Sequence, residues 1–112
     1  MTPKPVVPRE LANRDVENAI DHYLSEGAAE AALGFIAELE RAYSHLERHP
    51  ATGSSRYAFE MDLPGLRSWP LRRYPFLVFY REQDDHLDVW RVLDARADIP
   101  AWLQDDKESA PE

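Results

Sequence analysis

The chain of 112 residues contains no cysteine, so neither a disulfide framework nor a thiolate metal site can stabilise it. Its uninterrupted apolar runs cover only a few residues, as at 76–80, whereas a membrane-spanning helix needs ~20. The first five residues also lack the apolar stretch of a secretory signal. We therefore expect a cytoplasmic protein with one domain at residues 1–104 and a charged, disordered tail at 105–112.

Residues that carry common catalytic and cofactor chemistry are also sparse. The four glycines are scattered, which argues against a glycine-rich phosphate loop. His45 and His49 have the i, i+4 spacing of metal ligands but no third ligand nearby. Ser54 and Ser55 follow them without the strand-to-helix elbow of a serine nucleophile. We expect no metal site, no cofactor and no catalytic residue.

Metal-free cleavage of RNA, with the 2′-hydroxyl as the internal nucleophile, is the chemistry that the arginines leave open. It needs a base for the 2′-hydroxyl, an acid for the leaving oxygen and a cation for the developing charge. Arginine supplies the cation but does not deprotonate, and no lysine stands between Lys4 and Lys107. His86 lies among acidic residues that would repel an RNA backbone. The residues therefore favour a non-catalytic protein over an endoribonuclease.

Charge is distributed unevenly along the chain, whose formal net charge is −8 at pH 7. Residues 56–81 contain five arginines and two acidic residues, whereas the segment from residue 94 onward contains six acidic and two basic residues. The acidic total argues against direct binding of nucleic acid. The arginines of the middle segment indicate either a docking surface for a partner or solvent-facing positions that keep a sheet soluble.

The first half of the sequence predicts a short strand and two helices. Val6 and Val7 stand between prolines, which allows a brief edge strand. Apolar residues then recur at spacings of three and four from about residue 8 to 26 and again from 29 to 48. Gly27 separates the two runs and Pro50 ends the second. Two amphipathic helices joined by a short turn form a helical hairpin with one apolar face.

The second half has the period of β-strands. Alternation predicts strands at 57–62, 66–74, 76–82 and 87–93, with turns at 64–65 and 83–85. Pro70 indicates a bulge or an irregular edge in the second of these strands. We expect an α+β fold, with a short N-terminal strand and a two-helix hairpin packed on one face of an antiparallel β-sheet.

The strands at 76–82 and 87–93 are apolar on both faces, and the helical hairpin can cover only one of them. An aromatic outer face that nothing else covers marks a partner site. The alternative is that Trp102, Leu103 and the first strand fold back over this face. The few apolar residues after Leu93 favour a partner protein.

A family resemblance is carried by residues of these strands. They are LPGLRSWPLRRYPFLVFYRE at 63–82 and LDVWRVLDARADIPAWL at 87–103, supported by LERHPATGS at 46–54. Gly65 and Arg67, then Tyr80 and Arg81, then Arg91 follow one another with hairpin spacing. In this pattern the chain resembles the ParE/RelE superfamily of bacterial type II toxins over residues 5–103, and most closely its ParE branch, the plasmid stabilisation proteins.

The resemblance implies the RelE/ParE-like fold and a toxin that a ParD-like antitoxin neutralises by wrapping it and adding to its sheet. ParE relatives block DNA gyrase while it holds cleaved DNA, without catalysis of their own. RelE relatives instead cut messenger RNA in the ribosome, using basic residues and a tyrosine near the carboxy terminus. No tyrosine follows Tyr80 here. A gyrase inhibitor is therefore favoured, with a ribosome-dependent endonuclease and a homologue of weakened activity as alternatives.

We expect the antitoxin or the target to bind aromatic and charged residues of the strands and of the segment that follows them. These candidate residues are Arg67, Trp69, Arg72, Arg73, Tyr74, Phe76, Tyr80, Arg81, Trp90, Arg91, Asp94, Arg96 and Trp102. Similar sequences usually have His where Asp94 stands and Arg where Ala97 stands, and Arg96 compensates in part. If that pair engages gyrase, its replacement weakens toxicity, whereas antitoxin binding survives because it relies on the apolar faces.

Overall fold

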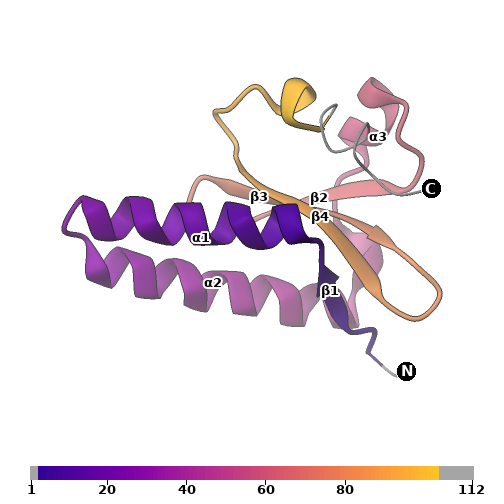
Figure 1. The fold of residues 1–112 in the computed structure, drawn as a ribbon. Helices are drawn as coiled ribbons and strands as arrows, with labels where there is room; N and C mark the ends of the chain where they lie inside the picture. Colours follow the sequence, from indigo (N-terminus) through magenta and orange to yellow (C-terminus); the bar gives the residue numbers. More distant parts are fainter. Residues whose placement is uncertain (1–2, 104–112) are drawn as a thin grey trace.

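The computed structural model describes residues 3–103 (Figure 1). Its elements in chain order are β1 (Val6–Pro8), α1 (Glu10–Ser25), α2 (Ala29–Arg48), the 3-10 helix η1 (Pro50–Thr52), α3 (Arg56–Met61), β2 (Leu66–Pro70), β3 (Phe76–Glu82) and β4 (Leu87–Asp94). Residues 99–103 form a further helical turn. The predicted tail at 105–112 lies outside the described residues.

The two long helices form the predicted hairpin. The chain reverses at Gly27, whose φ of 70° lies in the left-handed region that glycine reaches without strain. The Ala28 amide donates to the Tyr23 carbonyl at 2.9 Å and closes the turn. The apolar stripes of α1 and α2 then pack together on the same face of the sheet (Figure 1). Within residues 3–103, neither helix is long and apolar enough to span a bilayer.

The sheet has four strands in the order β1-β4-β3-β2. β2 pairs antiparallel with β3, and β3 with β4, but β1 pairs parallel to β4 with Val6 opposite Leu87. The sheet is therefore mixed and not wholly antiparallel as expected, because its first strand, β1, runs parallel to β4. A parallel neighbour requires a long crossover connection, and the helical hairpin after β1 begins that connection.

Residues 56–61 form helix α3, so the strand predicted at 57–62 is wrong. Tyr57 and Met61 alternate with polar residues, but they are also spaced i, i+4 and share one side of a helix. Both pack against the sheet, whereas Phe59 points outward with 83% of its surface exposed. Asp62 ends the helix with a left-handed φ of 53°.

Strand β2 ends at Pro70, earlier than the predicted end at residue 74. The amide and carbonyl of Ser68 both bond outward to Ser54, at 2.9 and 2.8 Å. Residues two apart share one direction in a strand, so Pro70 also faces outward and its missing N–H costs no bond to β3. The irregularity expected at Pro70 lies instead between Phe79 and Tyr80 of β3.

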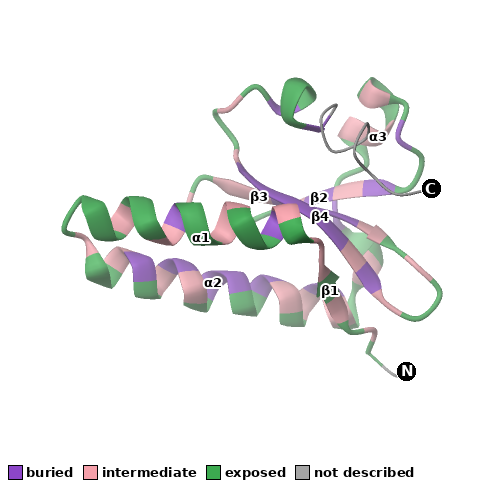
Figure 2. Ribbon diagram, in the orientation of Figure 1, coloured by how far each residue is buried: buried purple, intermediate pink, exposed green. Residues whose placement is uncertain are grey.

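Many residues of β3 and β4 are buried (Figure 2), and their side chains belong to two clusters, one on each side of the sheet. The helix side holds a cluster that includes Phe35, Leu46, Val78, Tyr80 and Val92. The opposite side holds a second cluster, which consists of Leu63, Leu66, Phe79, Trp90, Leu93, Ile99 and Leu103. Tyr57, Ala58, Met61 and Leu77 pack against this second cluster.

The prediction of an open outer face is therefore wrong. The chain covers much of this face itself, with α3 on one part and residues 99–103 on another. Of the three parts of the chain that the alternative placed over this face, Leu103 does fold back over it. Strand β1 instead joins the edge of the sheet, and Trp102 remains 46% exposed. Because α3 is a helix, it supplies the apolar cover that the segment after Leu93 lacks.

Candidate partner-binding surface

Tyr80 lies inside the fold and organises the loop after α2. Its hydroxyl donates to the Pro50 carbonyl at 2.7 Å and accepts from the Gly53 amide at 3.0 Å. Burial raises the pKa of Tyr80, although the bond from Gly53 acts in the opposite direction. Arg67 is held by the same loop, since its Nη1 donates to the Gly53 carbonyl at 2.8 Å.

Arg91 and Trp90 are each 3% exposed and also serve the interior. The Arg91 guanidinium forms an ion pair with Asp15 of α1. It also lies 5.1 Å from the ring centre of Trp102, which explains the place of that half-exposed indole. Trp90 donates from Nε1 to Asp88 at 3.1 Å and lies under the guanidinium of Arg81, 4.9 Å away.

The loop between β2 and β3 presents two exposed arginines, Arg72 and Arg73. Within residues 3–103, neither guanidinium forms an ion pair or a hydrogen bond. Arg73 has a φ of 68°, a left-handed conformation that costs a residue with a side chain roughly 1–2 kcal/mol. The Leu71 amide donates to the Phe76 carbonyl at 2.9 Å, so the loop is closed at its base.

Tyr74 and Phe76 anchor the same loop to the helices. The Tyr74 hydroxyl donates to the Ala31 carbonyl of α2 at 3.0 Å. Its ring centre lies 5.8 Å from that of Tyr23 and 6.0 Å from that of Phe35, and Phe76 lies 5.1 Å from Phe35. These two candidate residues therefore fix the position from which the arginines project.

The turn after β4 lies beside this loop, because the Ala95 amide donates to the Pro75 carbonyl at 2.7 Å. The Arg96 guanidinium donates to both carboxylate oxygens of Asp94, at 2.9 and 2.7 Å. This bond holds the pKa of Asp94 below its usual value. Arg96 is thus neutralised within its own turn, whereas Arg72 and Arg73 are cations at this end of the sheet that have no acidic partner among residues 3–103.

A groove of about 300 Å³ lies between α2 and β2 and joins Trp69 to this end of the sheet. Its lining consists of Glu38, Arg41, Ala42, His45, Trp69, Pro70, Leu71 and Arg72. The His45 ring stacks on Trp69 with centres 4.6 Å apart and 20° between the planes. Arg41 and Arg72 are exposed, whereas Glu38 is 8% exposed and accepts from Arg41 at 3.1 Å.

Sequence reasoning missed the contribution of α2 to this groove. The sequence pattern places His45 only in an i, i+4 pair with His49, and it gives Arg41 no part in binding. The available signal was the spacing of Glu38, Arg41 and His45, which follow one another at i+3 and i+4 and so share a side of α2.

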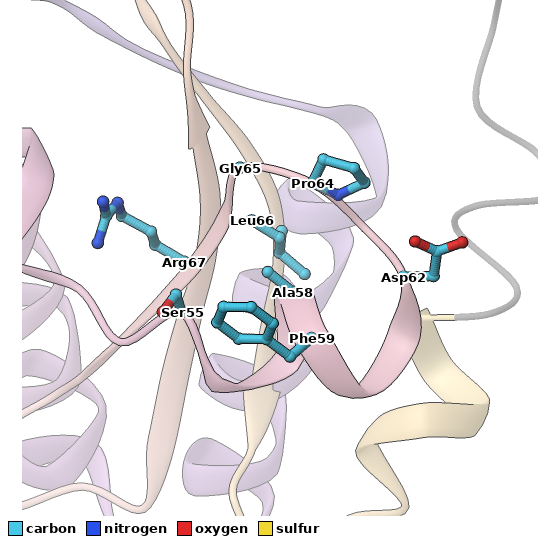
Figure 3. Close-up of a pocket in the computed structure, with 8 residues that line it drawn as sticks. All are labelled: Ser55, Ala58, Phe59, Asp62, Pro64, Gly65, Leu66 and Arg67. Atoms are coloured by element: carbon cyan, nitrogen blue, oxygen red, sulfur yellow. The ribbon is translucent and has the colours of Figure 1, made fainter.

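A second pocket of about 430 Å³ lies between α3 and the start of β2 (Figure 3). Leu66, Ala58 and the exposed Phe59 form its apolar part, and Gly65 and Pro64 form the turn above it. The guanidinium of Arg67 points away from Phe59 in this view. The strand predicted at 57–62 concealed this pocket, since it placed Phe59 on the same side as Tyr57 and Met61.

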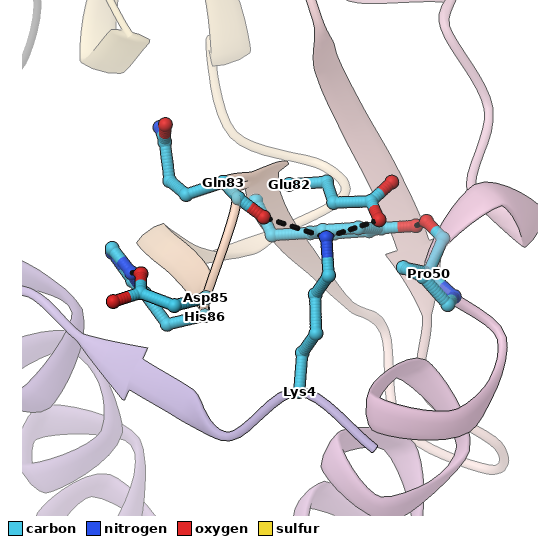
Figure 4. Close-up of polar contacts among 7 residues, drawn as sticks. Lys4, Pro50, Glu82, Gln83, Asp85 and His86 are labelled. Carbon is cyan, nitrogen blue, oxygen red and sulfur yellow. Dashed lines mark hydrogen bonds and ion pairs between the residues drawn. The ribbon is translucent and has the colours of Figure 1, made fainter. Parts of the chain in front are cut away.

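Polar contacts at the opposite end of the sheet connect the N-terminal segment to the β3–β4 hairpin (Figure 4). Lys4 Nζ donates to Glu82 Oε2 and to the Gln83 carbonyl, both at 2.7 Å. His86 pairs with Asp85 at 2.7 Å, which lowers the pKa of that exposed carboxylate. Within the described part of the chain, no three His, Asp or Glu side chains gather as metal ligands.

The described surface thus offers an anchored pair of free arginines beside an aromatic groove. Guanidinium groups bind carboxylates and phosphates through directed hydrogen bonds, and a neighbouring indole adds apolar contact. Of the candidate residues, Arg72, Arg73 and Trp69 lie together at this site. Tyr80, Trp90 and Arg91 lie inside the fold, and Arg67, Arg81 and Trp102 lie elsewhere on it.

The comparisons with known proteins agree with this fold. The family model described as ParE toxin of type II toxin-antitoxin system, parDE, matches residues 6–99. A solved chain of the chromosomal ParDE TA system from P. aeruginosa is similar, with a TM-score of 0.65 and 21% sequence identity over 80% of this chain and 92% of that chain. No curated protein sequence gives a significant match. The predicted α+β fold class is confirmed, with the mixed sheet described above.

Proposed function

Because the chain belongs to the family of ParE toxins of type II toxin-antitoxin systems, we propose that it inhibits DNA gyrase in the cytoplasm and that a ParD-like antitoxin neutralises it. The observation that carries the proposal is the pair Arg72 and Arg73, free of acidic partners within residues 3–103 and held on a closed loop. Cations fixed in this way lose little conformational freedom when they bind carboxylates of another protein.

The proposed inhibition works by binding rather than by bond cleavage. The phenol of Tyr80 is fully buried and both of its hydrogen bonds lie within the fold, so it cannot approach a phosphodiester. His86 is paired with Asp85 in the hairpin turn at the other end of the sheet from Arg72. These positions support a non-catalytic toxin over a ribosome-dependent endonuclease.

The target surface we propose is the end of the sheet formed by the loop at 71–75 and the turn at 94–97. Asp94 neutralises Arg96 there, and Ala97 carries no charge. Arg72 and Arg73 therefore supply the positive charge that meets the target. This arrangement is consistent with a weaker toxin than relatives that have His and Arg at positions 94 and 97.

Induction of the protein alone in growing cells tests the proposal. We expect replication to stop, the DNA-damage response to rise and cleaved gyrase–DNA complexes to accumulate. The purified protein should inhibit supercoiling by gyrase. Arg72→Glu with Arg73→Glu should relieve this inhibition, whereas Arg14→Glu with Arg48→Glu, which makes the same charge change at exposed helical positions, should not. A prompt halt in translation with cut messages would assign the protein to the endonuclease class instead.

A further inference from the structure

Helix α3 exposes an aromatic side chain beside a pocket. Tyr57 and Met61 lie one turn apart and pack against the sheet, so Phe59, midway between them, faces outward. Its exposure of 83% is the highest among the large apolar residues of the described range 3–103. The same residue borders the pocket of about 430 Å³ between α3 and β2 (Figure 3). A protruding ring and an apolar hollow therefore lie side by side on one surface.

The rim of this pocket carries one charge of each sign. In Figure 3, Arg67 lies on one side of the Phe59 ring and Asp62 lies on the other. The Arg67 guanidinium donates from Nη1 to the Gly53 carbonyl, and neither Arg67 nor Asp62 forms an ion pair within residues 3–103. An apolar centre with polar groups at its edge is the usual anatomy of a protein–protein interface.

This distribution of charge is self-complementary. A two-fold axis exchanges the two sides of a patch, so each side meets the opposite side of the second copy. Arg67 of one copy then faces Asp62 of the other, and the reverse contact forms at the same time. Phe59 of each copy faces the apolar pocket of the other. A strongly acidic or strongly basic partner would instead place a like charge against Asp62 or against Arg67.

The patch is also neutral, although the chain has a net charge of −8. Arg56 and Glu60 of α3 pair with each other at 3.2 Å, so they add no net charge beside the pocket. Arg67 and Asp62 are opposite in sign. Two copies therefore meet here without opposing two acidic surfaces, which would repel each other.

We propose that two copies of this chain associate through the α3 patch, which consists of Ala58, Phe59, Asp62, Pro64, Leu66 and Arg67. Phe59 of each copy packs in the pocket of the other, and Arg67 of each copy pairs with Asp62 of the other. Because the patch is small, the dissociation constant of this dimer lies in the micromolar range.

The proposed contact is separate from the surfaces described above. The pocket lies at the start of β2, whereas the groove lined by Trp69 and Arg72 and the loop at 71–75 lie at its end. Association through the α3 patch therefore leaves that groove and that loop open. The inference does not depend on the proposed function, since it concerns the chain alone.

Sedimentation equilibrium of the purified full chain tests the association. The wild type should form a dimer, and Phe59→Asp should weaken it by about tenfold or more, because a carboxylate replaces the apolar anchor. Leu33→Asp is the matched control on α2, where the residue is also apolar and 67% exposed, and it should change the dissociation constant by less than about threefold. A wild type that remains monomeric at about 1 mM would overturn the proposal, as would a dimer that Phe59→Asp leaves unchanged.

Exchange of the two charges tests the two-fold arrangement. Arg67→Glu and Asp62→Lys should each weaken self-association by about fivefold or more, since each opposes like charges in both contacts. An equimolar mixture of the two variants should associate more strongly than either alone, because every contact between them then joins opposite charges. Asp62→Asn keeps a residue that tolerates the left-handed φ of 53° and should give an intermediate loss. A mixture that associates no better than its components would overturn the pairing.

Other occupants of the pocket give different results. If the chain stays monomeric and Phe59→Asp instead weakens binding of the product of the adjacent gene, the pocket belongs to that partner and the proposal is overturned. A dimer that Arg41→Glu with Arg72→Glu dissociates, and that Phe59→Asp does not, would place the contact in the groove between α2 and β2 and would likewise overturn it.

Discussion

The Arg91 guanidinium and the Asp15 carboxylate form a two-point ion pair that joins β4 to α1. Arg91 Nε lies 2.8 Å from Asp15 Oδ2 and Nη2 lies 2.7 Å from Oδ1, with side chains 4% and 11% exposed. The same Oδ2 accepts the Val92 amide at 3.0 Å. One carboxylate therefore satisfies a buried cation and a strand amide, at positions far apart in the sequence.

Asp15→Asn should destabilise the fold by about 3–5 kcal/mol, because it removes the carboxylate charge that forms a two-point ion pair with the buried guanidinium of Arg91. Urea denaturation of the two proteins measures the difference. Asp21→Asn on the exposed side of α1 is the control and should change the free energy of unfolding by less than about 0.5 kcal/mol. A similar small loss for both variants would show that the ion pair does not stabilise the fold.

Stability should fall at high pH through Tyr43. Burial, with a further contribution from Asp15, raises the pKa of Tyr43 from 10.0 to about 12. The unfolded chain releases the Tyr43 proton from about pH 10, whereas the folded chain keeps it until about pH 12. The contribution of Tyr43 to the free energy of unfolding is therefore complete below pH 10 and is lost as the pH rises through the folded-state pKa of about 12. Tyr43→Phe should therefore reduce the decline in unfolding free energy between these pH values. An identical decline in the variant would contradict the assignment.

Gly34→Ala should destabilise the protein, although alanine normally improves a helix interior by roughly 1 kcal/mol over glycine. A Cβ at this position would meet the hydroxyl of Tyr74, which the Ala31 carbonyl and the packing against Phe35 hold in place. We expect a loss of about 1–3 kcal/mol in thermal or urea unfolding. Tyr74→Phe in the same chain removes the clashing oxygen and should recover part of the loss; a stabilised Gly34→Ala single variant would contradict this account.

The sequence predicts the elements whose pattern extends over many residues. The two helices repeat their apolar stripe over four or more turns. The strands predicted at 76–82 and 87–93 are rich in β-branched and aromatic residues, and their predicted positions agree with β3 and β4 of the structure. The segment 56–61 is too short for its pattern to identify the element, since Tyr57 and Met61 fit the period of a helix as well as that of a strand. The i, i+4 ion pair of Arg56 and Glu60 was a helical signal within that segment.

The candidate site was harder to predict because its residues depend on packing between distant segments. A buried Arg91 and an exposed Arg72 have the same side chain, and their roles differ because distant segments, among them Asp15 of α1 and Trp102, pack against Arg91. The error at α3 also changed the interpretation of the outer face, since the apolar residues that cover Phe79 and Trp90 were counted as part of the sheet. The groove between α2 and β2 could not be seen from either segment alone.

Arg73→Gly should raise stability while it lowers toxicity. The φ of 68° at Arg73 is unfavourable for a residue with a Cβ, so glycine should gain about 1 kcal/mol, less the entropy that it adds to the unfolded chain. The same change removes one of the two free cations from the proposed target surface. The measurements are urea denaturation and growth arrest after induction. Arg73→Gln separates the two effects, because glutamine keeps the strain of a long side chain in the left-handed region but lacks the charge. Arg73→Lys keeps the charge and should retain more toxicity than either of the other two variants. Equal growth arrest by the wild type and all three variants would show that Arg73 does not contribute to binding of the target.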